Sequence, residues 1–246
     1  MNRLLLPVAS VLCLLLSLGA EDFSTTFEDG KWDRALWLNV KSPRFDYLGE
    51  MVQHGNHITN KVPNLPDETI FKKHGSDVYA ALVLNRKFTG NAVISSRMSF
   101  DHRMAPLIVI APDLGKSAEG HPEFRDHFEI VLFDDGINVW RHQYADGKPS
   151  YYKAAYLKTA YLPKTVYNLQ VELRFVKQGC QMVLKCDGKE FGYLEMNLTE
   201  SYYVGLIACE GRNRFYDFKV IQPKPQPKPR RSKAVSAYAE TAVPAS

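Results

Sequence analysis

The sequence predicts an all-β protein built as an antiparallel two-sheet sandwich. Apolar residues alternate with polar ones at a period of two far more often than they recur at helical spacing. Turn signals separate these segments, and no long amphipathic helix lies between them. Many short strands without intervening helices favour an antiparallel sandwich over a parallel α/β sheet.

The strand pattern is clearest where two alternating segments flank a turn. The sequences Asp134-Asp135-Gly136 and Asp187-Gly188-Lys189 are turn signals of this kind, so each predicts a β-hairpin. A single short helical turn is expected within residues 159–167. The alternation predicts strands at residues 93–100, 128–133, 137–142, 167–175, 181–186, 190–194, 203–209 and 215–221.

The chain divides into three parts. Residues 1–20 have the charged, apolar and small-residue order of a secretory signal peptide, with an uncleaved anchor as the alternative. Residues 21–221 are expected to fold as one domain, and residues 222–246 are Pro/Lys-rich and expected to be disordered. No later apolar run approaches the roughly 20 residues of a membrane span. We therefore expect a secreted, periplasmic or cell-surface protein.

Charge and cysteine content restrict the function. The formal net charge of +4 comes from the two ends: without Arg3 and the tail, the remaining chain is near −1. A nucleic-acid-binding domain would carry a basic face, so this class is not expected. Cys180, Cys186 and Cys209 remain after processing. Cys186 bridged to Cys209, Cys180 bridged to Cys186, and buried free thiols are all open alternatives.

Two stretches resemble a known fold superfamily. The segment 23–30, followed by Trp32 and Trp37, resembles the opening strand of concanavalin A-like lectin/glucanase domains. Residues 203–211 and 215–220 resemble the closing strands of that superfamily, including its laminin G-like and 3-keto-disaccharide hydrolase groups. The resemblance spans about residues 22–221 and implies a jelly-roll sandwich of concanavalin A-like type. Its members include lectins, carbohydrate-binding modules, glycoside hydrolases and polysaccharide lyases, so it implies no single activity.

The first candidate site is the segment 123–129. On one continuous strand, Glu123, Arg125, His127 and Glu129 would share a face, while alternate apolar residues point into the core. Two carboxylates beside a histidine and an arginine suit acid–base chemistry on a glycosidic bond. The segment resembles the Glu-x-Asp-x-x-Glu signature of laminarinase-like glycosidases but has one more residue before Asp126, which turns that residue to the other face.

A second candidate site resembles that of alginate-lyase-like jelly rolls. Those enzymes use an arginine, a Gln/His pair and a Tyr/Lys motif to neutralise a uronate and abstract a proton. By this resemblance Tyr152 would abstract the proton with His142 as its partner, and Arg97 and Lys153 would hold the carboxylate. The tyrosine motif lies mid-chain here rather than near the last strands, which departs from the family pattern.

Sugar binding requires fewer specifically placed residues than catalysis does. Aromatic rings stack on the apolar faces of sugars, while polar side chains take the hydroxyl groups. Trp140, His142 and Tyr144 share one strand face, and Tyr151 and Tyr152 follow closely. The further rings expected to contribute from the N-terminal strand are Trp32 and Trp37.

The cofactor requirement is open. The sequence contains no zinc-type His-Glu-x-x-His, no phosphate-binding glycine loop and no Gly-x-Ser-x-Gly elbow, so no metal ligand set is assigned. Asp113, Asp134 and Asp135 lie in expected loops, where carboxylate oxygens suit a structural calcium.

Three functions are compatible with these patterns. The leading hypothesis is an extracytoplasmic protein that recognises a polysaccharide or oligosaccharide on one sheet face. A polysaccharide-degrading enzyme of the same fold, either hydrolase or lyase, is the first alternative. A non-catalytic structural or protein-binding module is the second.

Overall fold

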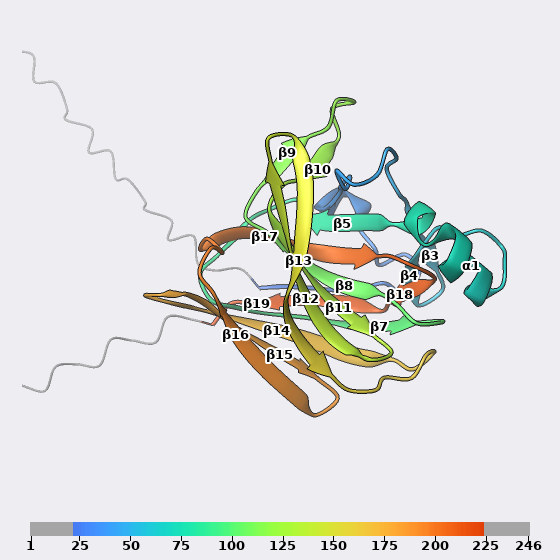
Figure 1. Ribbon diagram of the computed structural model, residues 1–246. Helices are drawn as coiled ribbons and strands as arrows, with labels where there is room; N and C mark the ends of the chain where they lie inside the picture. The colour runs from blue at the N-terminus through green and yellow to red at the C-terminus, as the bar shows by residue number, and fades with distance from the viewer. Residues whose placement is uncertain (1–21, 224–246) are drawn as a thin grey trace, which may run out of the picture.

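The computed structural model describes residues 22–223, which form two packed antiparallel sheets of nine and eight strands (Figure 1). This arrangement confirms the predicted all-β sandwich. The expected signal peptide at 1–20 and all but two residues of the expected tail at 222–246 lie outside the described residues. Among residues 22–223, no helix combines the length and the apolar character needed to span a bilayer.

The nine-stranded sheet is centred on β7, which pairs with β14 on one side and with β18 and β19 on the other. Strand β19 also pairs with β1, the first strand of the domain. In spatial order the sheet comprises β16 (Lys189–Glu195), β15 (Gly179–Cys186), β14 (Tyr167–Val176), β7 (Ala92–Phe100), β18 (Asn213–Phe215), β4 (His57–Asn60) and β3 (Met51–His54), with β19 (Asp217–Ile221) beside β7 and β1 (Phe23–Thr26) beside β19.

The eight-stranded sheet carries the long hairpin of β12 and β13 at one edge. In spatial order it comprises β13 (Lys148–Lys158), β12 (Gly136–Ala145), β11 (His127–Phe133), β8 (Pro106–Ala111), β17 (Ser201–Ala208), β5 (Ala80–Leu84) and β2 (Trp37–Asn39), with β6 (Phe88–Thr89) beside β17. Strands β9 (Leu114–Lys116) and β10 (Pro122–Phe124) form a separate two-stranded ribbon.

The main core lies between the two sheets. Alternation along β7 turns Ile94 and Met98 inward, where they join a cluster that includes Ile130 of β11 and Val204 of β17. The opposite face of the eight-stranded sheet, here called the outer face, is also partly covered. There Val109 and Ile207 belong to a second buried cluster, against which aromatic residues of the 40–50 segment pack. Because these residues cover part of it, the outer face is not fully open to solvent.

The predicted strands are confirmed, including both hairpins, except that residues 215–221 belong to two strands that are interrupted at Tyr216. Two other local expectations are wrong. The segment 159–167 contains no helix, because Pro163 is followed by Lys164 with a φ of 60°. A helix occurs instead at α1 (Asp67–His74), directly after Pro66. Only Ile70 of this helix is buried, so its sequence shows little helical periodicity. Within residues 22–223 the other helical turns are η1 (Arg34–Leu36) and η2 (Ser76–Val78).

The expectation of one continuous strand through residues 123–129 is also wrong. The chain leaves β10 at Phe124 and enters β11 at His127, so Glu123 belongs to the two-stranded ribbon and Glu129 to the eight-stranded sheet. Asp126 lies at this break, where its Oδ1 accepts a hydrogen bond from the Tyr144 backbone N–H at 2.9 Å.

The cysteines form no disulfide within the described part of the chain, which excludes both pairings left open by the sequence. Cys180 and Cys186 lie on the same strand, β15, and both are buried in the main core as free thiols. Cys209 follows β17 and belongs to the edge of the second cluster. The buried free thiol is therefore the alternative that the structure supports for Cys180 and Cys186.

Candidate functional site

Glu129 lies at the centre of a buried polar network on the outer face. Its Oε1 accepts hydrogen bonds from Arg44 Nη2 at 3.2 Å and from the Tyr79 hydroxyl at 3.3 Å. His142 Nε2 lies 3.0 Å from Oε2, and His127 Nε2 lies 3.4 Å from Oε1. We call these five residues the Glu129 network. Glu129 is only 5% exposed, so its charge depends on these partners rather than on water.

Strand pairing brings the two histidines together. The backbone positions of His127, His142 and Tyr151 lie side by side on β11, β12 and β13. The two imidazole rings stack with centroids 4.4 Å apart and planes 10° apart, and Tyr151 lies 5.4 Å beyond His142. Phe124 of β10 stacks on the other side of His127 at 4.5 Å. The result is a row of four rings that runs from the ribbon to the edge of the sheet.

The surroundings of the Glu129 network shift the pKa values of its members in different directions. Burial by itself would raise the pKa of Glu129, but the histidines and Arg44 outweigh it and hold that pKa well below its ordinary value. Burial and the Glu129 charge raise the pKa of the Tyr79 hydroxyl. Burial lowers the pKa of His127, although its bond to Glu129 acts in the opposite direction. Glu129 is therefore held as an ionised carboxylate, while burial opposes the protonation of the adjacent His127.

Among the described residues, the His127, Glu129 and His142 set is the one group with the composition of a metal site. Its ligand atoms lie within 4.8 Å of one another. A metal must lie close to the plane of each ligating imidazole, at about 2.0–2.1 Å from nitrogen. Two rings stacked with planes 10° apart cannot both direct a lone pair to one ion between them. Arg44 also occupies Glu129 Oε1. The set does not fit a resident metal ion in this arrangement.

The rim of the network is aromatic and cationic. The Tyr151 ring is 57% exposed and lies 5.9 Å from Trp140, with the planes at 70°. The Arg44 guanidinium lies 5.6 Å from the centre of the Tyr151 ring. The Lys153 ammonium lies 5.7 Å from the Trp140 ring. Exposed rings and charged donors next to buried polar groups provide the contact types that a sugar requires.

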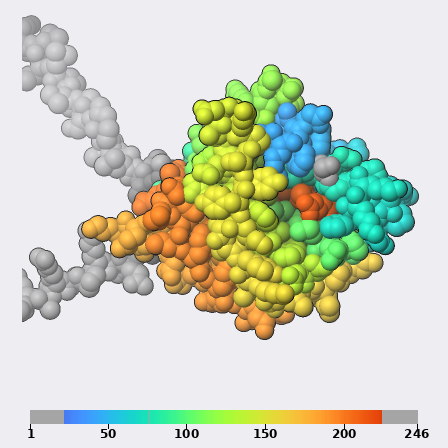
Figure 2. Space-filling view, in the orientation of Figure 1, coloured from blue at the N-terminus to red at the C-terminus, as the bar shows by residue number. Residues whose placement is uncertain are grey.

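A surface cavity of about 440 Å³ adjoins the network through Arg44. Figure 2 shows this region as a hollow between the blue loop, the cyan α1 and the yellow β13, with the orange-red segment that follows β17 inside it. Its volume is within the range of about 300–1,000 Å³ typical of ligand pockets. The cavity is lined by Arg44, Phe45, Phe71, Lys72, Lys73, Gly75, Cys209 and Glu210.

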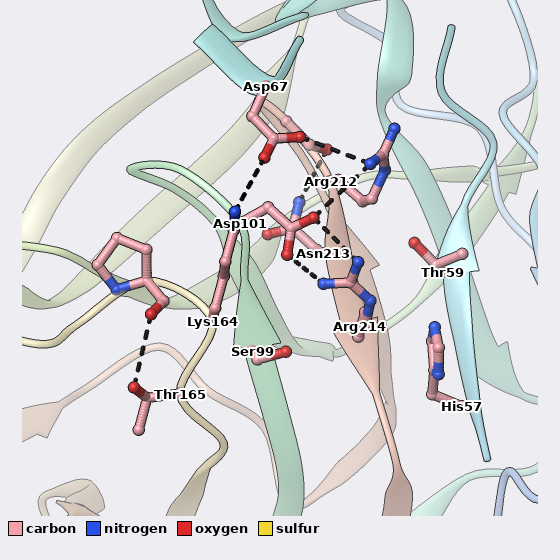
Figure 3. A network of polar contacts seen from close by, with 12 residues as sticks. His57, Thr59, Asp67, Ser99, Asp101, Lys164, Thr165, Arg212, Asn213 and Arg214 are labelled. Carbon is pink, nitrogen blue, oxygen red and sulfur yellow. Dashed lines mark hydrogen bonds and ion pairs between the residues drawn. The ribbon is translucent and has the colours of Figure 1, made fainter. Parts of the chain in front are cut away.

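A second polar network, shown in Figure 3, holds the start of α1. This helix supplies Phe71, Lys72 and Lys73 to the cavity lining. Asp67, the first residue of α1, forms ion pairs with Arg212 at 3.5 Å and with Lys164 at 3.8 Å. Arg212 also lies 3.7 Å from Asp101, which pairs with Arg214 of β18 through both carboxylate oxygens. The helix is thereby attached to the 209–212 turn, which carries Cys209 and Glu210 of the cavity lining, and through Arg212 to Asp101.

Some predicted site residues do come together. His127 and Glu129 share a face of β11, and Trp140, His142 and Tyr144 share the same face of β12, as expected. Glu123 and Arg125 form an ion pair, and Arg125 stacks on Tyr144 at 4.4 Å. Of these three residues Glu123 lies on the two-stranded ribbon, Arg125 follows it and Tyr144 lies on β12, and none of them is a member of the Glu129 network.

Other predicted residues lie elsewhere. Arg97 is on β7 of the nine-stranded sheet, where its Nε pairs with Asp217 at 2.6 Å, so it does not accompany His142. Tyr152 faces the opposite side of β13 from Tyr151, because adjacent strand residues point to opposite faces. The tyrosine beside His142 is therefore Tyr151.

The remaining rings and aspartates are also separate from the site. Trp37 is buried in the main core and Trp32 packs against that core, so neither joins the outer face. Asp113 pairs with Lys87, Asp134 with Arg103, and Asp135 with the Tyr156 hydroxyl. These three aspartates form no common calcium site among the described residues.

Sequence reasoning missed Arg44, Tyr79 and Glu210. Arg44 and Tyr79 are 85 and 50 positions from Glu129 along the chain and reach it only through the fold. The one local signal was an arginine beside the aromatic residues Phe45 and Tyr47 in a polar connection.

Solved structures with the same fold include both binding proteins and enzymes. A Lotus tetragonolobus seed lectin superposes with a TM-score of 0.52 at 8% identity, covering 84% of this chain and 100% of the lectin. The carbohydrate-binding module CBM66 from Bacillus subtilis gives 0.51 at 9%, covering 76% and 96%. A glycoside hydrolase family 16 endo-glucanase from Bacteroides ovatus gives 0.50 at 10%, covering 81% and 99%.

These similarities establish the fold and confirm the resemblance read from the sequence. The chain is a sandwich of the concanavalin A-like lectin/glucanase fold. The sequence matches no protein-family model and no curated protein. Because the identities are 8–10%, the similarities define the architecture and leave the ligand open.

Proposed function

We propose that the protein binds a polysaccharide or oligosaccharide outside the cytoplasm, through the rim of the Glu129 network. The observation that carries the proposal is the exposed Tyr151 ring beside Trp140 and Arg44, next to a cavity of about 440 Å³. Tyr151 offers a stacking surface, and its ring contacts Trp140, His142 and Arg44. Lectins, carbohydrate-binding modules and glycoside hydrolases share the fold, which supports a carbohydrate ligand.

A glycan array followed by calorimetric titration of the full chain tests the proposal. Tyr151→Ala should weaken binding about tenfold or more, because it removes the stacking ring. Tyr152→Ala is the matched control, since that ring is similarly exposed at 48% but faces the other side of the strand. Equal losses in both variants, or no glycan bound by the wild type, would refute binding at this rim.

An enzyme is the second candidate, and the Glu129–His142 contact favours it. The Glu129 carboxylate lies 3.0 Å from the His142 Nε2 atom, and carboxylates and imidazoles are the groups that most often transfer protons in enzyme sites. In a lyase, Tyr151 rather than Tyr152 would be the tyrosine beside this histidine. Incubation with a polysaccharide panel distinguishes the activities: new reducing ends alone indicate a hydrolase, and ultraviolet absorbance of unsaturated products indicates a lyase.

Loss of turnover in both Glu129→Gln and His142→Gln, with Tyr152→Phe unaffected, would support catalysis at this site. A wild-type protein that binds a glycan without converting it would leave recognition as the function.

A further inference from the structure

The lining of the cavity beside the Glu129 network contains more cationic than acidic side chains. Of its eight lining residues, Arg44, Lys72 and Lys73 are cationic, and Glu210 is the one acid. Phe45 of the 40–50 segment and Phe71 of α1 supply apolar surface to the lining. Such a lining suits a ring with a charged substituent better than it suits a purely apolar ligand.

Arg44 is held in place before any ligand arrives. Its Nη2 donates to Glu129 at 3.2 Å, and its Nε donates to Ser42 Oγ at 3.4 Å. The rings of Phe45 and Tyr79 lie 5.3 and 5.5 Å from the guanidinium carbon. These contacts engage only part of the five N–H donors of the group. The side chain is 22% exposed and lines the cavity, so the remaining donors are available there.

The two lysines of α1 add positive charge to the lining. Lys73 has no ion-pair partner among residues 22–223, and Lys72 pairs with Glu68 at 2.6 Å on the helix surface. An exposed pair of this kind contributes little to stability, so Lys72 can exchange Glu68 for a ligand at small cost. Arg44 pairs with Glu129 and Lys72 with Glu68, so Lys73 is the cation of the lining without an ion-pair partner among the described residues.

Glu210 is the acid of this lining, and its ionised form opposes the binding of an anion. Burial raises the pKa of its carboxyl, with Arg44 acting in the opposite direction. Glu210 therefore accepts a proton more readily than an ordinary glutamate does, and its protonated form can donate a hydrogen bond.

We propose that the cavity binds an anionic substituent of the glycan, a carboxylate or a sulfate, with Arg44 as the fixed donor and Lys72 and Lys73 as supporting cations. This inference rests on the proposed carbohydrate function and specifies its ligand class. Arginine pairs with planar or tetrahedral oxyanions through parallel N–H donors, and its fixed orientation avoids the entropy cost of ordering on binding.

Calorimetric titration of the full chain with charge-matched ligands tests the inference. One arm compares oligogalacturonate with its fully methyl-esterified form, and the other compares a sulfated galactan oligosaccharide with its desulfated form. The anionic member of at least one pair should bind about tenfold or more tightly than its neutral counterpart. The arm in which this occurs identifies carboxylate or sulfate as the source.

Variants then test which side chains bind the anionic group. Lys73→Gln should weaken anionic binding several-fold and leave neutral binding unchanged, while Arg44→Gln should weaken it about tenfold or more. Lys219→Gln is the matched control, because Lys219 is an exposed lysine on β19 of the other sheet. Since Arg44→Gln disturbs the Glu129 network, Lys73→Gln keeps the test valid if the arginine variant does not fold.

The outcomes separate the two proposals. Equal affinity for neutral and anionic members would overturn the anionic ligand and leave the carbohydrate function standing. Anionic binding that Lys73→Gln and Lys219→Gln reduce equally would overturn the cavity as its location. A protein that binds none of the four ligands and no member of a glycan array would overturn the carbohydrate function itself.

Discussion

Glu129→Gln tests the energetics of the site most directly. The substitution keeps the size of the side chain and removes the charge that Arg44 and His142 face at 3.2 and 3.0 Å. Removing one member of a buried ion pair costs about 3–5 kcal/mol, because the other charge stays desolvated. The Arg44 side chain remains 22% exposed, so water offsets part of this loss. We expect destabilisation near the lower end, about 3 kcal/mol.

Thermal unfolding followed by circular dichroism or calorimetry measures the effect. For a domain of this size a loss of 1 kcal/mol lowers Tm by about 2–4 °C, so Tm should fall by about 6–12 °C. Glu28→Gln is the matched control, because Glu28 pairs with Lys31 on the surface, with half of its side chain exposed. That variant should unfold at the wild-type temperature.

The pH dependence gives an independent check on the sign. The pKa of Glu129 is held below its ordinary value in the folded state, so its stabilising contribution is present above the unfolded pKa of about 4.3. It is lost as pH falls through the folded pKa. The difference in stability between wild type and Glu129→Gln should therefore be full at pH 7 and shrink below about pH 4. A variant as stable as the wild type at pH 7 would refute the description of Glu129 as an ionised anchor.

Three further predictions concern the rest of the sandwich. Glu195→Gln should destabilise the fold by about 3 kcal/mol in chemical denaturation, because Glu195 of β16 forms a buried ion pair with Arg141 of β12 at 3.0 Å; an unchanged midpoint would contradict this. Burial lowers the pKa of His127, so the unfolded chain takes up a proton near pH 6.5 that the folded chain resists, and stability should fall below about pH 6.5. His127→Gln should flatten this slope in unfolding titrations between pH 7 and 5, and an identical slope would contradict the assignment. Burial raises the pKa of Cys180 to about 12 and that of Cys186 to about 11, so both thiols should resist alkylation in the native protein at pH 8 and react after unfolding, as mass spectrometry can measure.

Local sequence patterns predicted the strands because their causes are local. Side-chain alternation is a property of a single strand, so residues 128–133 could be assigned an inward apolar face from their own order. For the same reason Trp140 and His142 were correctly placed on one face of β12. The turn at Asp187-Gly188 needs positive φ at both residues, and the structure shows values of 49° and 71°.

The errors arose where a local pattern stops or changes. Alternation through residues 123–129 gives no sign that the chain leaves one sheet at Phe124 and enters another at His127. Tyr151 and Tyr152 are neighbours, so only one of them can face His142, and the pairing of β12 with β13 makes this Tyr151. A β-bulge between Val139 and Trp140 shifts that pairing by one position and has no clear sequence signature.

The sequence by itself determined the architecture of this protein: an all-β sandwich, its two hairpins, and the faces on which His127, Glu129 and His142 lie. Only the tertiary structure decided the composition of the site. Arg44, Tyr79 and Glu210 come from connections far from β11 along the chain, and their contacts depend on how the 40–50 segment, α1 and the 209–212 turn pack over the outer face. Alternation records which side a residue faces, whereas the partner it meets there is set by strand order and loop packing, which short-range sequence patterns do not encode.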